Sequence, residues 1–201
     1  MTTLWLVRHG QTEWNLEGRY QGQADVPLNA AGMLQAQTLA AELAGQHFDA
    51  IYSSDLQRAR VTAETIGRSL NLPVHTDVRL REINQGQWEG KIYRDLLNCY
   101  SAEMLARREN PYGFRPPDGE TAGEVALRVI KVADEISEAY PKGRIIIVSH
   151  ALALAALFCK AKGLALLEVY DHLPHNAHPK VVQWPPETAG QEIPPSETVS
   201  G

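Results

Sequence analysis

The chain has 201 residues, a formal net charge of −5, and 44% hydrophobic and 21% charged residues, which is typical of a globular protein large enough for a full core. The acidic balance and the absence of a clustered Lys/Arg run exclude an extended nucleic-acid-binding surface, because such binding needs several basic groups together. The longest apolar stretch, 151–159, is too short to span a bilayer. Cys99 and Cys159 form no C-x-x-C pair, and the N-terminus enters a strand at once. We therefore expect a reduced, cytoplasmic protein, although the sequence leaves a disulfide between the two cysteines open.

Strand and helix signals alternate along the chain. Strands are predicted at 4–7, 50–53, 73–75, 144–148 and 181–184, and helices at 30–45, 57–70, 121–140 and 151–162. Such alternation indicates an α/β fold, a three-layer α/β/α sandwich with a mostly parallel central sheet. Helix starts are predicted from Asn29, from Asp55, and from Thr121 in a capping box with Glu124, and helix ends from Gly45 and Gly163.

The helical pattern breaks between residues 90 and 120. Short helical pieces at 93–98 and 102–108 precede a loop rich in Pro and Gly, and we expect this insertion to be a small helical lid over the site. The prediction is a single domain over residues 1–184. Residues 185–201 are rich in Pro, Glu, Thr and Ser and form a tail with too little apolar surface to order itself.

Two apolar strands each run into a histidine, the first at Arg8-His9 and the second at Ser149-His150. Continuous apolar runs suit strands buried on both faces of a parallel sheet, and ligands of such sheets collect beyond the strands' carboxyl ends. The loop at 10–15 offers backbone N–H groups, a hydroxyl and an amide that suit an oxyanion, and Arg8 adds positive charge. A neutral His9 facing a guanidinium-bound phosphate is a nucleophile in position.

Four motifs carry a family resemblance. They are Arg8-His9-Gly10-x-Thr12-x-x-Asn15, the segment 53–64 with Arg58, the segment 80–90 with Glu82, and Val148-Ser149-His150. In this order, over most of residues 4–151, they resemble the histidine phosphatase superfamily, also called the phosphoglycerate mutase-like family. The run at 116–121 looks more like its phosphatase-type branch.

The resemblance implies a role for each matching residue. His9 would be the nucleophile, Arg8 and Arg58 would bind the phosphoryl oxygens, His150 would stabilise the transferring group, and Glu82 would be the general acid and base. The residues expected to contact substrate are Gly10, Thr12, Asn15, Gln21 and Gly22. No cofactor and no metal are expected.

The predicted function is a phosphomonoesterase that hydrolyses a small phosphorylated metabolite through a phosphohistidine, with neither nucleic acid nor membrane as partner and with a homodimer left open. Phosphoglycerate mutase remains an alternative, because the same phosphohistidine can return its phosphoryl group to substrate and Arg107-Arg108 could bind a second acidic group. A non-catalytic binding module on the same fold is the alternative from another class. The cluster His172, His175 and His178 could be read as metal ligands, but we interpret it as incidental.

Overall fold

The computed structural model describes residues 1–186, so the predicted tail lies almost wholly outside the described residues. The strands are β1 Thr2–Arg8, β2 Ala50–Ser53, β3 Val74–Thr76, β4 Arg144–Ser149 and β5 Lys180–Trp184. The helices are α1 Glu13–Leu16, α2 Ala30–Leu43, α3 Gln57–Leu70, α4 Tyr93–Cys99, α5 Ser101–Glu109, α6 Ala122–Ala139 and α7 Ala151–Lys162. Short 3-10 helices, η1 Val78–Leu80, η2 Gly86–Trp88 and η3 Leu166–Asp171, lie in the connections.

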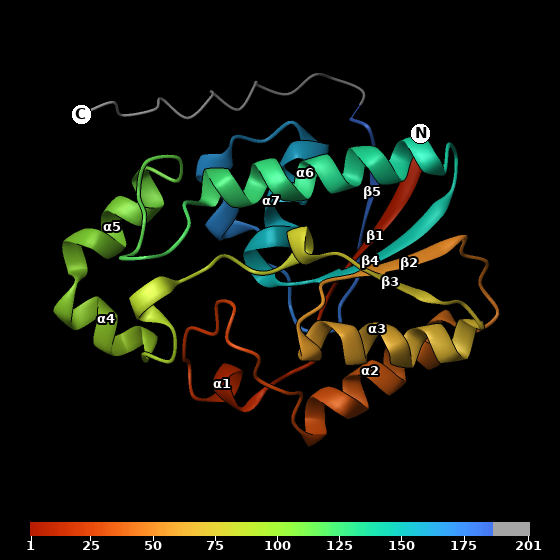
Figure 1. Ribbon diagram of the computed structural model, residues 1–201, viewed down its shortest axis with the longest axis horizontal. Helices are drawn as coiled ribbons and strands as arrows, with labels where there is room; N and C mark the ends of the chain where they lie inside the picture. Colours follow the sequence, from red (N-terminus) through yellow and green to blue (C-terminus); the bar gives the residue numbers. More distant parts are fainter. Residues whose placement is uncertain (187–201) are drawn as a thin grey trace.

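The strands form one sheet in the order β3-β2-β4-β1-β5. Strands β1 to β4 run parallel, and β5 pairs antiparallel with β1 at the edge. Helices α6 and α7 cover one face of this sheet and α2 and α3 the other (Figure 1). The predicted α/β sandwich with a mostly parallel sheet is therefore confirmed.

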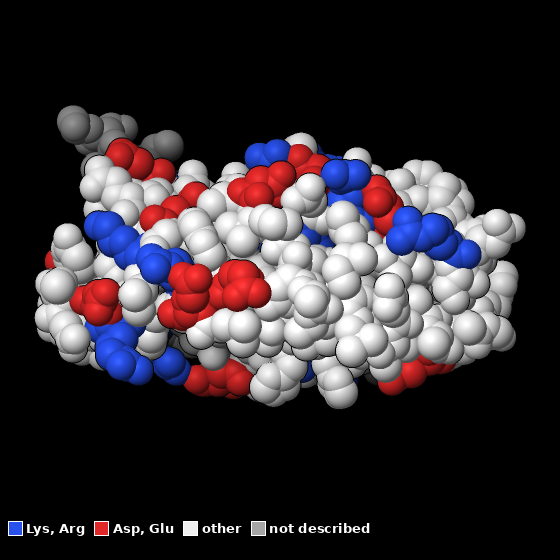
Figure 2. All heavy atoms as spheres, turned by 90° about the horizontal axis from the view of Figure 1, so that it is seen from below, with Lys and Arg blue, Asp and Glu red and all other residues white. Residues whose placement is uncertain are grey.

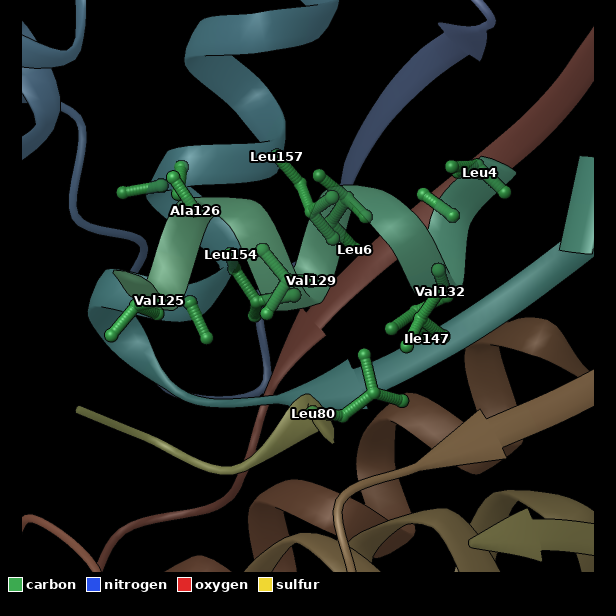
Figure 3. Close-up of a cluster of buried hydrophobic side chains, with 14 of the residues drawn as sticks. Leu4, Leu6, Leu80, Val125, Ala126, Val129, Val132, Ile147, Leu154 and Leu157 are labelled. Atoms are coloured by element: carbon green, nitrogen blue, oxygen red, sulfur yellow. The ribbon is translucent and has the colours of Figure 1, made fainter. Parts of the chain in front are cut away.

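Side chains of the two central strands divide between two cores, because successive residues of a strand point to opposite faces. Leu4, Leu6 and Ile147 pack with α6 and α7 in the cluster drawn in Figure 3. Ile146 and Val148 pack with α2 and α3 on the other side. Both faces of β4 are buried, which explains why its sequence is a continuous apolar run.

Most predicted helix ends are confirmed, and one is wrong. The Asn29 side chain caps α2, the capping box of Thr121 and Glu124 begins α6, and Gly163 ends α7 in the left-handed conformation with φ of 67°. Asp55 does not cap α3, because the helix begins after Leu56 without a side-chain cap. The Asp55 carboxylate instead accepts a hydrogen bond from Arg81 Nε at 2.7 Å, which ties the start of α3 to the loop that carries Glu82.

Helices α4 and α5 form the predicted helical insertion and lie at one end of the molecule (Figure 1). They have a small core of their own, in which Leu96 and Met104 pack with Trp88. Among the described residues, no helix is both long and apolar enough to cross a membrane. On the face turned to the viewer in Figure 2, basic and acidic side chains are interspersed rather than gathered by sign.

Candidate active site

The pairing register of the sheet brings the two predicted histidines together. Arg8 pairs with Ser149, and the backbone N–H of His9 donates to the Ser149 carbonyl at 3.0 Å. His9 and His150 therefore leave neighbouring strands side by side, with ring centroids 5.2 Å apart and both rings buried. Parallel strands with aligned ends account for this meeting of residues 141 positions apart.

The His9 imidazole is neutral, and a hydrogen bond to the Gly10 carbonyl fixes its orientation. Its Nδ1 lies 2.7 Å from the Gly10 carbonyl oxygen. A carbonyl only accepts, so Nδ1 carries the hydrogen and Nε2 keeps its lone pair. Burial, and next the positive charges of Arg58 and Arg8, hold the pKa of His9 well below its usual range. The ring is thus unprotonated at neutral pH and offers Nε2 as a nucleophile.

Two guanidinium groups line the cavity beside His9. Arg58 is fully buried, and its Nη1 and Nη2 donate to the carbonyls of Ala24 at 2.6 Å and Gly22 at 2.7 Å. Burial lowers the pKa of Arg58 to about 10, opposed by the negative charge of Glu82, so the group stays charged at neutral pH.

Arg8 donates from Nη1 to the Pro174 carbonyl at 2.9 Å. Burial lowers its pKa too, again opposed by Glu82. The Nε atoms of Arg8 and Arg58 are buried and have no hydrogen-bond partner in the part of the chain that the structure describes. Within residues 1–186, no carboxylate lies at ion-pair distance from either guanidinium. One fully buried and one partly buried guanidinium group give the cavity the uncompensated positive charge that an anion site needs.

His150 is held by Ser54 from the neighbouring strand end. Its Nε2 lies 2.9 Å from Ser54 Oγ, and its Nδ1 is buried without a partner. Burial, and after it the charge of Arg58, hold the pKa of His150 well below its usual range. This ring is therefore also neutral at neutral pH.

Glu82 sits at the N-terminus of α7. Its Oε2 accepts from the backbone N–H of Leu152 at 3.2 Å, and its Oε1 accepts from Ala153 at 3.3 Å and from Ile83 at 3.0 Å. Two of the N–H groups that a helix leaves unpaired at its start are thus satisfied by the Glu82 carboxylate, which the helix dipole also favours there.

The predicted substrate-contact residues divide into two groups. Asn15, Gln21 and Gly22 line the cavity with His9. Gly10 and Thr12 do not line it. The Gly10 N–H donates to Thr62 Oγ1, and a Cβ at Gly10 would lie 2.5 Å from the Gly32 carbonyl oxygen, so glycine is needed there for close packing against α2. The Thr12 hydroxyl is buried in the capping box that begins α1.

Several residues at the site were not predicted. Asn176 donates from Nδ2 to the His9 carbonyl at 2.8 Å and so anchors the backbone of His9. The cavity, of about 300 Å³, is also lined by Tyr20, Met104 and Tyr170, and by Arg107, which the sequence offered only as a contact for a second acidic group. Asn176 lies within the histidine cluster, between His175 and His178, and its sequence position gives no indication that it contacts His9. No group of three or more His, Cys, Asp or Glu in the part of the chain that the structure describes is placed to hold a metal.

Comparison with known proteins places this geometry in a family. The model of the histidine phosphatase superfamily (branch 1) matches residues 4–191. Phosphoserine phosphatase 1 of Hydrogenobacter thermophilus is 34% identical over 90% of this chain and 86% of its own length. A Proteus mirabilis protein named "Probable phosphoglycerate mutase GpmB" is 38% identical over 82% of this chain and 76% of its own length.

Solved structures agree with the sequence matches. Mycobacterial glucosyl-3-phosphoglycerate phosphatase superposes with a TM-score of 0.83 at 31% identity, covering 89% of this chain and 90% of that one. The chain therefore belongs to the histidine phosphatase superfamily, and it is a phosphoric monoester hydrolase. The reading of the chain as a binding module without catalysis is set aside.

Proposed function

We propose that this enzyme hydrolyses a small phosphomonoester through a phosphohistidine on His9. Nε2 of His9 attacks phosphorus in line, the bond to the leaving oxygen breaks, and water later hydrolyses the N–P bond to release inorganic phosphate. Arg8 and Arg58 bind the phosphoryl oxygens, whose charge is largest in the transition state. The single observation that carries the proposal is a buried neutral imidazole beside the guanidinium groups of Arg8 and Arg58, neither of which has a carboxylate partner among the described residues.

Glu82 is proposed to act as the general acid in the first half-reaction and as the general base in the second. It lines the same cavity as His9, and as a carboxylic acid it would protonate the departing alkoxide. The resulting carboxylate would then take a proton from the attacking water. Backbone donors orient its two oxygens, and Oε2, which accepts only from Leu152, keeps a lone pair for the transferred proton.

His150 is proposed to donate a hydrogen bond to the transferring phosphoryl group. With the Ser54 hydroxyl donating to Nε2, the hydrogen of the neutral ring is on Nδ1, the buried atom that has no partner among residues 1–186. A phosphoryl oxygen would satisfy that donor. Asn15 and Gln21, which line the same cavity, would complete the contacts to the phosphoryl oxygens.

The substrate is proposed to be small and the reaction to need no metal. A cavity of about 300 Å³ is at the lower end of the range for ligand sites. Both cysteines are free thiols, which suits the reduced cytoplasmic location that we infer. We also propose that residues 1–184 act as a single domain.

Hydrolysis of p-nitrophenyl phosphate tests the proposed function. We expect turnover by the parent protein and loss of turnover in His9→Asn, which keeps a side-chain donor toward the Gly10 carbonyl. His47→Asn is the matched control, because His47 is exposed and remote from the cavity. Inactivity of the parent, or equal activity of parent and His9→Asn, would refute the proposal.

Phosphoglycerate mutase activity stays a second candidate because of the 38% identical relative that carries that name. The two activities differ in the acceptor of the phosphoryl group, which is water for the phosphatase and substrate for the mutase. With 3-phosphoglycerate, we expect released inorganic phosphate to account for the substrate consumed. Accumulation of the 2-phospho isomer without phosphate release would favour the mutase.

A further inference from the structure

Arg128, in α6, contacts the loop that carries Glu82, and every N–H of its guanidinium has a partner. Its Nη1 donates to the carbonyls of Arg79 at 2.7 Å and Arg81 at 2.6 Å. Its Nη2 donates to the Glu82 carbonyl at 2.9 Å and to Glu120 Oε2 at 3.0 Å, and its Nε donates to Glu120 Oε1 at 3.1 Å. All five donors of this guanidinium are therefore used, three of them on the backbone of one loop.

Glu120 extends this contact to the other side of Glu82. Its Oε2 also accepts from the backbone N–H of Asn84 at 2.8 Å, and its own N–H donates to the Asn84 carbonyl at 2.9 Å. The Arg128 and Glu120 side chains are both partly buried, which reduces the solvent screening that makes exposed ion pairs weak. The ion pair of Arg128 and Glu120 thus binds the backbone on both sides of Glu82.

The loop depends on these side chains because it is irregular. Residues 81–85, between η1 and η2, form neither helix nor strand. Within residues 1–186, the carbonyls of Arg81 and Glu82 accept from no backbone N–H, so side chains supply their hydrogen bonds. The carboxylate of Glu82 is held to α7 only by long contacts of 3.2 and 3.3 Å, and its shortest bond, from the N–H of Ile83 at 3.0 Å, moves with the loop. Where this carboxylate lies therefore depends on where the loop is fixed.

We propose that Arg128, paired with Glu120, is a positioning residue that aims the Glu82 carboxyl at the leaving oxygen. The inference rests on the proposed function, in which Glu82 is the general acid. Its proton passes to the leaving oxygen as the P–O bond breaks, which releases the alcohol and leaves a carboxylate. Arg128 does not line the cavity, so it acts through Glu82 and not on the substrate. A displacement of about 1 Å at a catalytic group can cost about 10²-fold in rate.

The position of Arg128 predicts a selective defect. The groups that hold the phosphoryl oxygens come from other elements, since Arg8 ends β1 and Arg58 belongs to α3. Loss of Arg128 therefore displaces the acid and leaves phosphoryl binding in place. The defect is confined to substrates whose leaving group needs a proton, whereas a general loss of structure would affect all substrates alike.

Two substrates of similar size measure this selectivity. Benzyl phosphate and p-nitrophenyl phosphate each carry one ring, but only the benzyl alkoxide needs a proton on leaving. The ratio of kcat/KM for benzyl phosphate to kcat/KM for p-nitrophenyl phosphate therefore reports acid catalysis. In Arg128→Met we expect this ratio to fall roughly tenfold or more, a part of the 10²- to 10⁴-fold range of general acid–base catalysis. Arg128→Lys keeps the charge and some of the donors and should restore part of the ratio.

Two comparisons separate positioning from loss of stability. Asp134→Ala removes the hydrogen bond of 2.8 Å that joins α6 to Trp184 Nε1, outside the cavity, and should keep the parent's ratio. In Glu82→Gln, which already lacks the acid, the added change Arg128→Met should not lower the ratio further. If Arg128→Met does not fold, Arg128→Lys and Glu120→Gln carry the same test, because a ratio measured within one protein does not depend on the folded fraction.

The outcomes separate the inference from the proposed function. If the parent does not hydrolyse p-nitrophenyl phosphate, the proposed function fails. If it does, but Glu82→Gln keeps the parent's ratio, Glu82 is not the acid and its positioning by Arg128 is overturned. If Glu82→Gln lowers the ratio, three results still overturn the inference: an unchanged ratio in the Arg128 and Glu120 variants, an equal fall in Asp134→Ala, or a further fall when Arg128→Met is added to Glu82→Gln.

Discussion

Acid should destabilise this protein through its two active-site histidines. The pKa values of His9 and His150 are both held well below the ordinary range by burial and by the neighbouring arginines. In the unfolded chain each ring regains a pKa of about 6.5. Between the folded and unfolded pKa values the unfolded state binds more protons, so the stability that these groups contribute is present above about pH 6.5 and is lost as the pH falls.

The size of the loss follows from this linkage. If neither ring binds a proton in the folded state, each one lowers the free energy of unfolding by about 1.4 kcal/mol between pH 7.5 and pH 5.5. The two together lower it by about 3 kcal/mol. That is a large fraction of the roughly 5–15 kcal/mol by which a domain of this kind is stable. Substituting one histidine should remove about half of the loss.

Urea unfolding at pH 7.5 and pH 5.5 measures this difference. The variants are His9→Asn, whose amide can replace Nδ1 toward the Gly10 carbonyl, His150→Gln, whose amide can replace Nε2 toward Ser54 Oγ, and the double variant. Buffers must lack phosphate and sulfate, which would bind beside Arg8 and Arg58. The carboxylates contribute the same pH dependence of stability to the parent and to the double variant, so their contribution cancels when the two proteins are compared. An equal pH-dependent loss in both proteins would refute the reasoning.

Three more predictions concern activity. Glu82→Gln should slow the hydrolysis of alkyl phosphates by roughly 10²- to 10⁴-fold, the range of general acid–base catalysis. The burst with p-nitrophenyl phosphate should slow much less, because that leaving group departs without a proton. Equal losses on both substrates would mean that Glu82 transfers no proton. Activity should persist in EDTA. If EDTA abolished activity and zinc restored it, the histidine cluster at 172–178 would be a set of metal ligands. Asn176→Ala removes the hydrogen bond to the His9 carbonyl and should lower kcat/KM roughly fivefold, with a change in KM alone contradicting an effect on the nucleophile.

The periodic segments were predictable because their patterns are local. Helices α3 and α7 begin and end where the sequence predicts, and β2 matches as well. The two apolar strands that run into histidine also predicted a ligand site beyond their carboxyl ends, and His9 and His150 lie side by side there because the strands are parallel neighbours. The ends of the lid helices α4 and α5 were each predicted to within one residue.

What the sequence missed depends on contacts between distant segments. Asp55 has the chemistry of a helix cap, but its carboxylate pairs with Arg81, 26 residues further along the chain. Thr12 has the chemistry of a phosphate ligand, but its hydroxyl is used to begin α1. Asn176 reaches His9 only because β5 returns beside β1, and the aromatic setting of Arg107 appears only once α5 lies against Tyr20 and η3. In each case the sequence shows which hydrogen bonds the side chain can make, but not which distant residue it makes them with.

The central claim is that His9 carries the phosphoryl group during turnover. Rapid quench of the parent with substrate labelled in the phosphoryl group, followed by digestion and mass spectrometry, tests this claim most directly. We predict an acid-labile, alkali-stable phosphoryl group on the peptide that contains His9, absent from His9→Asn. A label on a serine, a label on another histidine, or turnover without any phosphoenzyme in the burst phase would contradict the account.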